Sequence, residues 1–166
     1  MTKIEKYSHE ELKKLEQKIY ENFLPHSPNR PVFDPQMRHQ FGYENDIIKA
    51  EFILSKPRAE IDWSAYSKIN QEAASFIFML SSDFYKYAFP SLLAFCISPK
   101  SILPSGGINI LVGFFMWSHL DTGNLYTDWE LDFLLSLNDV QSSIVANVLK
   151  IHGEDLILER YWGEYL

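Results

Sequence analysis

The apolar residues of this chain recur mainly three or four positions apart, which is the spacing of a helix with one buried face. Near the N-terminus, Ser8 and Glu11 form a capping box, in which each side chain satisfies a backbone N–H group of the other residue. The pattern therefore predicts an amphipathic helix from Ser8 to about Leu24. Its apolar face contains Leu12, Leu15, Ile19 and Phe23.

The C-terminal third contains two further capping boxes. Thr127 with Glu130 predicts the start of a short helix, and Asn138 with Gln141 predicts a longer one that Gly153 ends. The first helix carries Trp129, Phe133 and Leu134, and the second places Val140, Ile144, Val148 and Ile151 on one face. Because Asn138 follows the first helix almost at once, we expect a tight helical hairpin. A last short helix over residues 155–166 carries Tyr161 and Trp162.

Two helices in the middle of the chain are expected to form the centre of the core. Ser64 is expected to cap the first, whose inner face contains Tyr66, Ile69, Ala73, Phe76, Ile77 and Leu80. Ser82 is expected to cap the second, over residues 83–97, which is apolar nearly all round and therefore buried. Pro90 lies inside this second helix and removes one backbone hydrogen bond, so a kink or a break is expected there.

The connecting segments are marked by proline and glycine. Residues 25–42 contain four prolines and few aliphatic side chains, which predicts an irregular and mobile loop. A short helix is expected from about Asn45 to Leu54, before Pro57. Residues 98–107 are expected to form a second loop. Residues 108–120 suit a helix or a strand, and we predict a helix because no partner strands are evident.

These patterns predict an all-α fold, a single compact domain over residues 1–166 with about seven helices and a central helix kinked at Pro90. Residues 1–42 supply the N-terminal helix and the proline-rich loop, and residues 43–166 supply the helical core. A length of 166 residues is typical of one domain. The 46% of hydrophobic residues is enough to build a sizeable core.

The formal net charge of −7 is localised on the chain. The last 46 residues contain nine acidic and two basic side chains, while acids and bases balance in the first 120. Nucleic-acid binding requires a basic surface, and so does binding to an anionic membrane, so we expect neither. The aromatic content leaves room for a dimer interface, but the oligomeric state stays open.

The acidic C-terminal third is the predicted partner-binding region, and its partner would be a basic protein. The residues assigned to this site are Asp128, Asp132, Glu154, Asp155, Glu159 and Glu164. Dipole and capping effects at a helix start explain Asp128, Glu130 and Asp132 without any function. They do not explain the four acids after residue 153. The alternative is that the acidic surface only keeps the protein soluble.

No pattern of a known catalytic or metal site occurs, so we predict no catalytic residue, no metal and no cofactor. The sequence lacks a P-loop, a G-x-S-x-G elbow, H-E-x-x-H, C-x-x-C and an EF-hand loop. Ser105 to Gly107 is interpreted as a plain turn. His119 near Asp121, or His152 near Glu154, could form a metal site or an acid–base pair. A position at a helix C-terminus explains these histidines equally well.

The single cysteine and the N-terminal sequence indicate the cellular compartment of the protein. Cys96 is the only cysteine, so no internal disulfide can form, and its apolar surroundings predict a buried and inert thiol. A nucleophile pair between Cys96 and a histidine is therefore disfavoured. The N-terminus lacks the apolar stretch of a secretory signal, and the apolar run 108–117 is too short to span a bilayer. We expect a cytoplasmic protein.

Two function classes remain. The first is a non-catalytic protein-binding module, of the immunity or adaptor kind, that uses the acidic third. The second is a small-molecule-binding protein or an enzyme of unrecognised type, with a cleft near Pro90 and the 98–107 loop. The absence of a known catalytic pattern favours the first class.

Three segments of the chain carry a similarity to a known family. The first runs from Leu80 to Leu93, with Asp83, Tyr87 and Pro90 at the positions of an acid, a tyrosine and a proline, after an upstream Trp63. The second is a Leu-x-x-x-Gln helix, formed by Leu137 and Gln141 and followed by Val145 and Leu149. The third is the closing pair Tyr161 and Trp162.

In this order, over about residues 63–162, the three segments resemble a bacterial family known as domain of unknown function 6714. Phe84 departs from the family pattern, where a small residue is common. The N-terminal helix and its proline-rich loop lie outside the similarity. The resemblance implies an all-helical fold and implies no activity.

Overall fold

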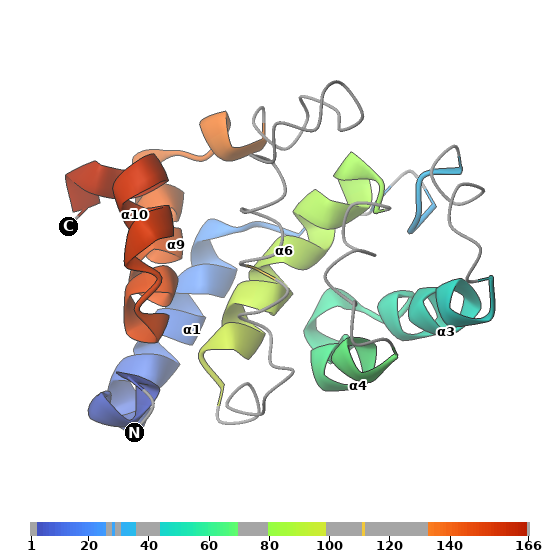
Figure 1. Cartoon of the computed structure of the whole chain (residues 1–166), viewed down its shortest axis with the longest axis horizontal. Coiled ribbons are helices and arrows are strands. Elements are labelled where there is room, and N and C mark those ends of the chain that lie inside the picture. The colour runs from blue at the N-terminus through green and yellow to red at the C-terminus, as the bar shows by residue number, and fades with distance from the viewer. Residues whose placement is uncertain are drawn as a thin grey trace.

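The fold is all-α, as the sequence predicts (Figure 1). The computed structural model describes residues 3–25, 28, 31–35, 44–69, 80–98, 111 and 133–165. Within these ranges there are six α-helices and three short 3-10 helices. In the described residues, β-type backbone pairing is limited to an isolated antiparallel bridge between Phe33 and Leu80. No helix in the described ranges is both long and apolar enough to cross a lipid bilayer.

The elements follow one another with short connections where the chain is described. In chain order they are η1 (Lys3–Lys6), α1 (His9–Asn22), α3 (Glu44–Leu54), η2 (Arg58–Glu60), α4 (Trp63–Lys68), α6 (Ser82–Cys96), α9 (Asp139–His152), α10 (Asp155–Trp162) and η5 (Gly163–Tyr165). The 3-10 helix η1 is not among the elements that the sequence pattern predicts.

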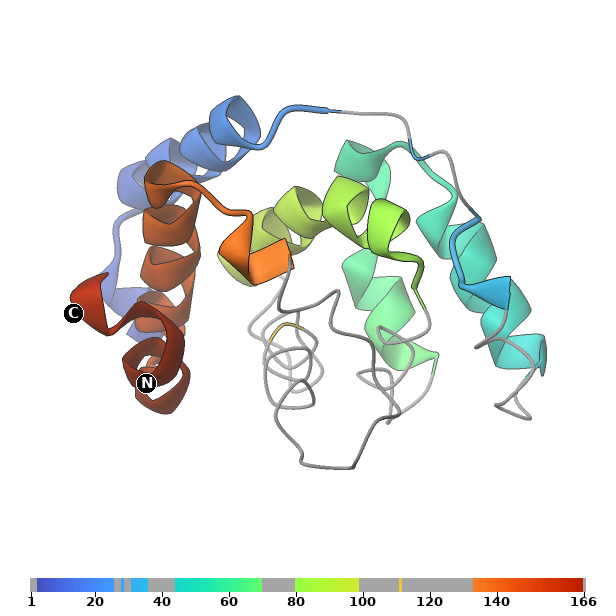
Figure 2. The same cartoon turned by 90° about the horizontal axis from the view of Figure 1, so that it is seen from above.

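The helices pack in two groups on either side of α6 (Figures 1 and 2). On one side α1 contacts both α6 and α9, while α10 and η1 pack on α9. On the other side α3 contacts α4, and η2 contacts α6. The two termini lie at the same end of the molecule, beside α9 and α10. Segments from both ends of the chain therefore build one helical layer.

The capping boxes of α1 and α9 are confirmed. In α1 the Ser8 hydroxyl accepts a hydrogen bond from the Glu11 N–H at 3.2 Å, and the Glu11 carboxylate accepts one from the Ser8 N–H at 2.7 Å. Asn138 and Gln141 exchange the equivalent bonds at 2.9 and 3.1 Å. Gly153 ends α9 with φ of 77°, a left-handed conformation that glycine adopts without a steric penalty.

Two predicted caps were wrong by one or two residues. Asp62, rather than Ser64, caps α4, because its carboxylate accepts a hydrogen bond from the Ala65 N–H at 2.9 Å. Ser81, rather than Ser82, caps α6 through the Phe84 N–H. In both cases a neighbouring residue with equal capping ability stands earlier in the chain, and the sequence alone did not discriminate between them.

Helix α6 is the buried centre of the fold. Ten of its fifteen residues are buried, Pro90 among them. The helix continues through Pro90 to Cys96, so the proline does not break it. Phe89 lies at the middle of an aromatic cluster, with ring centroids 5.8 Å from Phe23 and 5.0 Å from Phe133. This cluster joins α6 to α1 and to the helical turn before α9.

Part of the proline-rich segment is fixed against α6. The carbonyl oxygens of Pro31 and Val32 accept hydrogen bonds from the side chain and the backbone of Ser81, at 2.7 and 2.9 Å. Phe33 beside them is buried. These bonds explain why Ser81 stands at the start of α6. Ser81 caps the helix and also binds the backbone of Pro31 and Val32.

Several expectations fall wholly or mainly outside the described residues. They concern the helix opened by Thr127, the loop 98–107 and the segment 108–120, of which only Leu111 is described, as helical and buried. Ala73, Phe76 and Ile77 of the expected inner face are also outside. One described residue corrects the expected face of α9, because Val140 is 52% exposed while Ile144, Val148 and Ile151 are buried.

Candidate functional site

Helix α10 presents the acidic residues that the sequence singles out. Its inner side chains Ile157, Leu158 and Trp162 are buried, and the helix packs on α9. Asp155 and Glu159 are exposed on the opposite side, one helical turn apart, and Glu164 is exposed in η5. Asp128 and Asp132, the other two acids of the predicted site, lie outside the described residues.

The four described acids differ in their surroundings. Glu154 is partly buried at the start of α10, where its backbone N–H donates to the Leu149 carbonyl at 3.1 Å. The side chains of Glu159 and Glu164 make no hydrogen bond or ion pair with any described residue. Within the described ranges, these two carboxylates are therefore free to contact another molecule.

The positions of Glu159 and Glu164 do not stabilise α10. Glu159 lies in the last turn of α10, and Glu164 lies just beyond it. The C-terminal end of a helix carries partial negative charge, so a carboxylate there is unfavourable. Asp155 and Glu159 are also like charges at the i, i+4 spacing, which costs a few tenths of a kcal/mol. Glu159 and Glu164 therefore have no structural explanation in the helix itself. Asp155 does have one, because it lies in the first turn of α10, where the helix dipole favours an acid, so the sequence-based expectation was wrong for this residue.

A first groove lies between α1 and α9 and has a volume of about 250 Å³. Its lining residues are Tyr7, Glu11, Leu12, Lys14, Leu15, Lys18, Asn147 and Ile151. The aliphatic members are Leu12, Leu15 and Ile151, and the charged members come only from α1. The sequence analysis did not find this groove, since no local pattern shows which faces of two helices meet.

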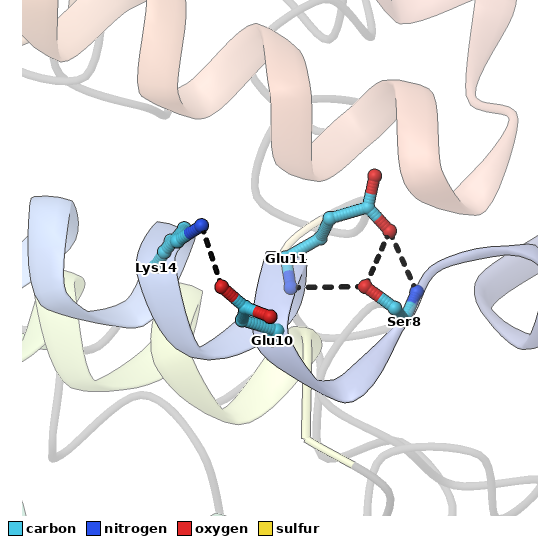
Figure 3. Close-up of polar contacts among 4 residues, drawn as sticks. All are labelled: Ser8, Glu10, Glu11 and Lys14. Atoms are coloured by element: carbon cyan, nitrogen blue, oxygen red, sulfur yellow. Dashed lines mark hydrogen bonds and ion pairs between the residues drawn. The ribbon is translucent and has the colours of Figure 1, made fainter.

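Local bonds engage two of the charges of this groove (Figure 3). The Glu11 carboxylate accepts hydrogen bonds from the hydroxyl and the backbone N–H of Ser8, both at 2.7 Å. These bonds hold the pKa of Glu11 below its usual value, so the side chain is ionised at neutral pH. The Lys14 ammonium pairs with Glu10 at 2.7 Å. Lys18 has no such partner among the described residues.

A second groove lies on the other side of α1, against the end of α6, and has a volume of about 220 Å³. It is lined by His9, Leu12, Lys13, Glu16, Ala94, Ile97 and Ser98. Ser98 is the first residue of the expected 98–107 loop, so this groove adjoins the cleft expected for the alternative function. Pro90 is buried and does not line it.

Cys96 and His152 are neighbours, but they do not form a nucleophile pair through the Nε2 atom. The His152 Nε2 donates a hydrogen bond to the backbone carbonyl of Cys96, at 2.6 Å. Cys96 is fully buried, and burial raises the pKa of its thiol far above neutral pH. Burial lowers the pKa of His152, against the opposing effect of its bond to Cys96. The contact joins the C-terminal ends of α6 and α9.

Other residues that the sequence singles out have structural contacts. The Gln141 side chain donates to the Asn22 carbonyl at 2.9 Å, beyond its part in the capping box. The Tyr87 hydroxyl accepts a hydrogen bond from the Arg58 N–H at 2.8 Å. No group of three His, Cys, Asp or Glu side chains in the described ranges is arranged to hold a metal ion. His119 and Asp121 lie outside those ranges.

Comparisons of the chain with family models, with curated proteins and with solved structures found no match. The resemblance to domain of unknown function 6714 therefore stays a prediction. The surface of α10 and the two grooves beside α1 are the candidate sites.

Proposed function

We propose that the chain is a non-catalytic protein-binding module, of the immunity or adaptor kind, whose α10 face contacts a basic surface of another protein. The observation that carries this proposal is the pair Glu159 and Glu164. Both are exposed, neither has a partner among the described residues, and both stand where the helix dipole opposes them. A basic partner would neutralise this unfavourable charge.

The inner face of α10 supports this role. Ile157, Leu158 and Trp162 are buried, so the helix is held by packing and its carboxylates start from defined backbone positions. A prearranged charged surface loses less conformational freedom on binding than a flexible one. Exposed charges of this kind accelerate association and select the partner more than they increase affinity. Asp128 and Asp132 are included in the proposal from the sequence alone, because they lie outside the described residues.

The test compares two variants with the same net charge. In the first, Glu159→Lys and Glu164→Lys reverse the α10 face. In the second, Glu16→Lys and Glu60→Lys reverse two exposed acids on other elements. The immobilised protein is used to capture partners from a lysate of its own cells, and association rates are then measured at low and high salt.

We expect the wild type and the second variant to capture a basic protein, with an association rate that falls as salt rises. The first variant should lose this capture. Equal capture by both variants would contradict the proposal, and so would binding that does not respond to salt.

The alternative, a small-molecule or catalytic site near the end of α6, has the second groove in its favour. Its ionisable residues His9, Lys13 and Glu16 all come from α1, and all three are exposed. Catalytic groups are usually tuned by burial and by close charged neighbours. The second groove offers a surface for binding, and its exposed groups give less support to catalysis.

A further inference from the structure

We propose that the first groove, between α1 and α9, binds a small amphipathic anion, with an apolar body and a single carboxylate or similar acidic head. This inference goes beyond protein binding by α10, because it concerns a different surface and a different class of ligand. It rests on the aliphatic residues that line the groove, on its size, and on Lys18, the one lining cation without an ion pair among the described residues.

The aliphatic lining residues of the groove can cover an apolar body. Leu12 and Leu15 are only partly buried, although both pack on the core, and Ile151 of α9 lies beside them. Ligand sites in proteins are typically mostly apolar, with a few polar groups that fix orientation. A bound apolar body would remove the remaining exposed surface of these side chains from water.

The size of the groove limits the ligand. Its volume of about 250 Å³ is just below the range of roughly 300–1,000 Å³ that is typical of pockets for drug-sized molecules. A medium-chain carboxylate is closer to this size than a nucleotide or a phospholipid. Octanoate is therefore a suitable probe.

The two ends of the groove differ in charge, and the end at Lys18 favours an anion. The ionised Glu11 lies at the other end, two helical turns from Lys18. Glu11 is engaged by Ser8 at the positive end of the α1 dipole, and Glu10 neutralises Lys14 (Figure 3). Lys18, one turn beyond Lys14, is left without an ion pair in the described part of the chain. An acidic head would bind at Lys18, and the apolar body would extend over Leu15 and Leu12 toward Tyr7.

Two polar residues at the edge complete the site. Asn147 is exposed on α9, and Tyr7 is 36% exposed before α1. Their amide and hydroxyl groups can donate hydrogen bonds, and both line the groove. Because Asn147 projects from the surface of α9, it is also a position at which a larger side chain can fill the groove without disturbing the core.

The experiment is a titration of the full chain with octanoate, followed by amide NMR shifts and by calorimetry. Lys18→Gln removes the cation, and Asn147→Phe fills the groove. Lys13→Gln is the matched control, since Lys13 is an exposed lysine of the same helix that faces the second groove. Thermal unfolding of each variant checks that the fold is kept.

We expect shifts at Leu12, Leu15 and Ile151, and affinity that is about tenfold or more weaker in Lys18→Gln, as for a lost charged hydrogen bond. Binding should be absent in Asn147→Phe and unchanged in Lys13→Gln. Octanol, which lacks the charge, should bind more weakly than octanoate. The Glu159→Lys, Glu164→Lys variant should bind octanoate as the wild type does, so this test is independent of the protein-binding proposal.

Three results would overturn the inference. The first is the absence of octanoate-induced shifts at the groove. The second is equal affinity of the wild type and Lys18→Gln, and the third is equal weakening in Lys18→Gln and Lys13→Gln, which would indicate general attraction to a basic surface.

Discussion

Helices α1 and α10 both lie against α9, but they use their polar side chains in opposite ways. In α1 several charged groups bond within the helix or to its N-cap residue, namely Glu11 with Ser8, Lys14 with Glu10, and Glu21 with Gln17, and Lys18 is an exception. In α10 and the residues after it, Glu159 and Glu164 have no partner among the described residues. A count of charges therefore does not show which charges are available to another molecule.

The ends of the two helices differ as well. The last carbonyl groups of α1 are satisfied from distant parts of the chain, by Gln141 at Asn22 and by the Arg58 guanidinium at Phe23, at 2.9 and 2.8 Å. Such carbonyls have no partner within their own helix. Helix α10 instead continues into η5 near the C-terminus. Helix α1 is tied to the core by hydrogen bonds and packing, and α10 is held mainly by its apolar inner face.

The largest loss of unfolding free energy is expected from Trp162→Ala, which tests the apolar inner face of α10. Trp162 is 4% exposed, and truncation of a buried tryptophan typically costs about 3–5 kcal/mol. Urea unfolding should show a loss of this size, with Glu159→Ala as a control that changes stability little. If the two variants were equally stable, packing would not hold α10 on α9, and its carboxylates would not form a fixed surface.

A smaller loss of unfolding free energy is expected from Arg58→Met, which tests the hydrogen bond that connects the end of α1 to the rest of the fold. The Arg58 side chain donates to the Phe23 carbonyl and lies over the Tyr20 ring, 5.5 Å from its centroid. Removing the donor leaves a part-buried carbonyl unsatisfied, which costs about 1–3 kcal/mol. Lys56→Met is the matched control, because Lys56 is an exposed cation that lies over Phe52. Equal losses in both variants would show that Arg58 contributes no more than a surface cation.

The sequence predicted what local chemistry decides. The all-α fold and the starts of α1 and α9 follow from residues three positions apart, Ser8 with Glu11 and Asn138 with Gln141. The caps of α4 and α6 were missed because two polar residues stood close together at each helix start, and for α6 a contact elsewhere in the chain favoured one of them. Ser81 is an example, since it also binds Pro31, fifty residues away.

The candidate sites divide in the same way. The sequence analysis singled out Glu159 from the charge count of the last 46 residues, and the structure adds that Ile157, Leu158 and Trp162 are buried while Glu159 is exposed. The groove beside Lys18 depends on how α1 crosses α9, more than a hundred residues later in the chain. No periodicity in either segment reports that crossing, and the sequence therefore gave no signal for Tyr7, Lys18 or Asn147 as a group.

A pH-dependent effect is expected at the contact between α6 and α9. Because burial lowers the pKa of His152, the unfolded chain binds this proton more readily than the folded one. The stability from the neutral ring is complete above the unfolded pKa of about 6.5 and is lost as the pH falls through the folded value. His152→Gln should therefore reduce the loss of unfolding free energy between pH 7.5 and 5.

His9→Gln is the matched control, because His9 is exposed at the start of α1. This variant should keep the pH dependence of the wild type. If the unfolding free energy of His152→Gln depended on pH as that of the wild type does, protonation of His152 would not contribute to the pH dependence of stability.

The smallest effect on stability, and the most direct test of the comparison, is expected from Glu159→Lys with Glu164→Lys. Neither carboxylate has a described partner, so the variant should unfold within about 0.5 kcal/mol of the wild type, as surface substitutions usually do. Because lysine is favourable near a helix C-terminus, any change should be a gain. A loss above 1 kcal/mol would mean that these acids stabilise the fold, and α10 would then resemble α1. Unchanged stability together with lost partner capture would separate binding from folding at this surface.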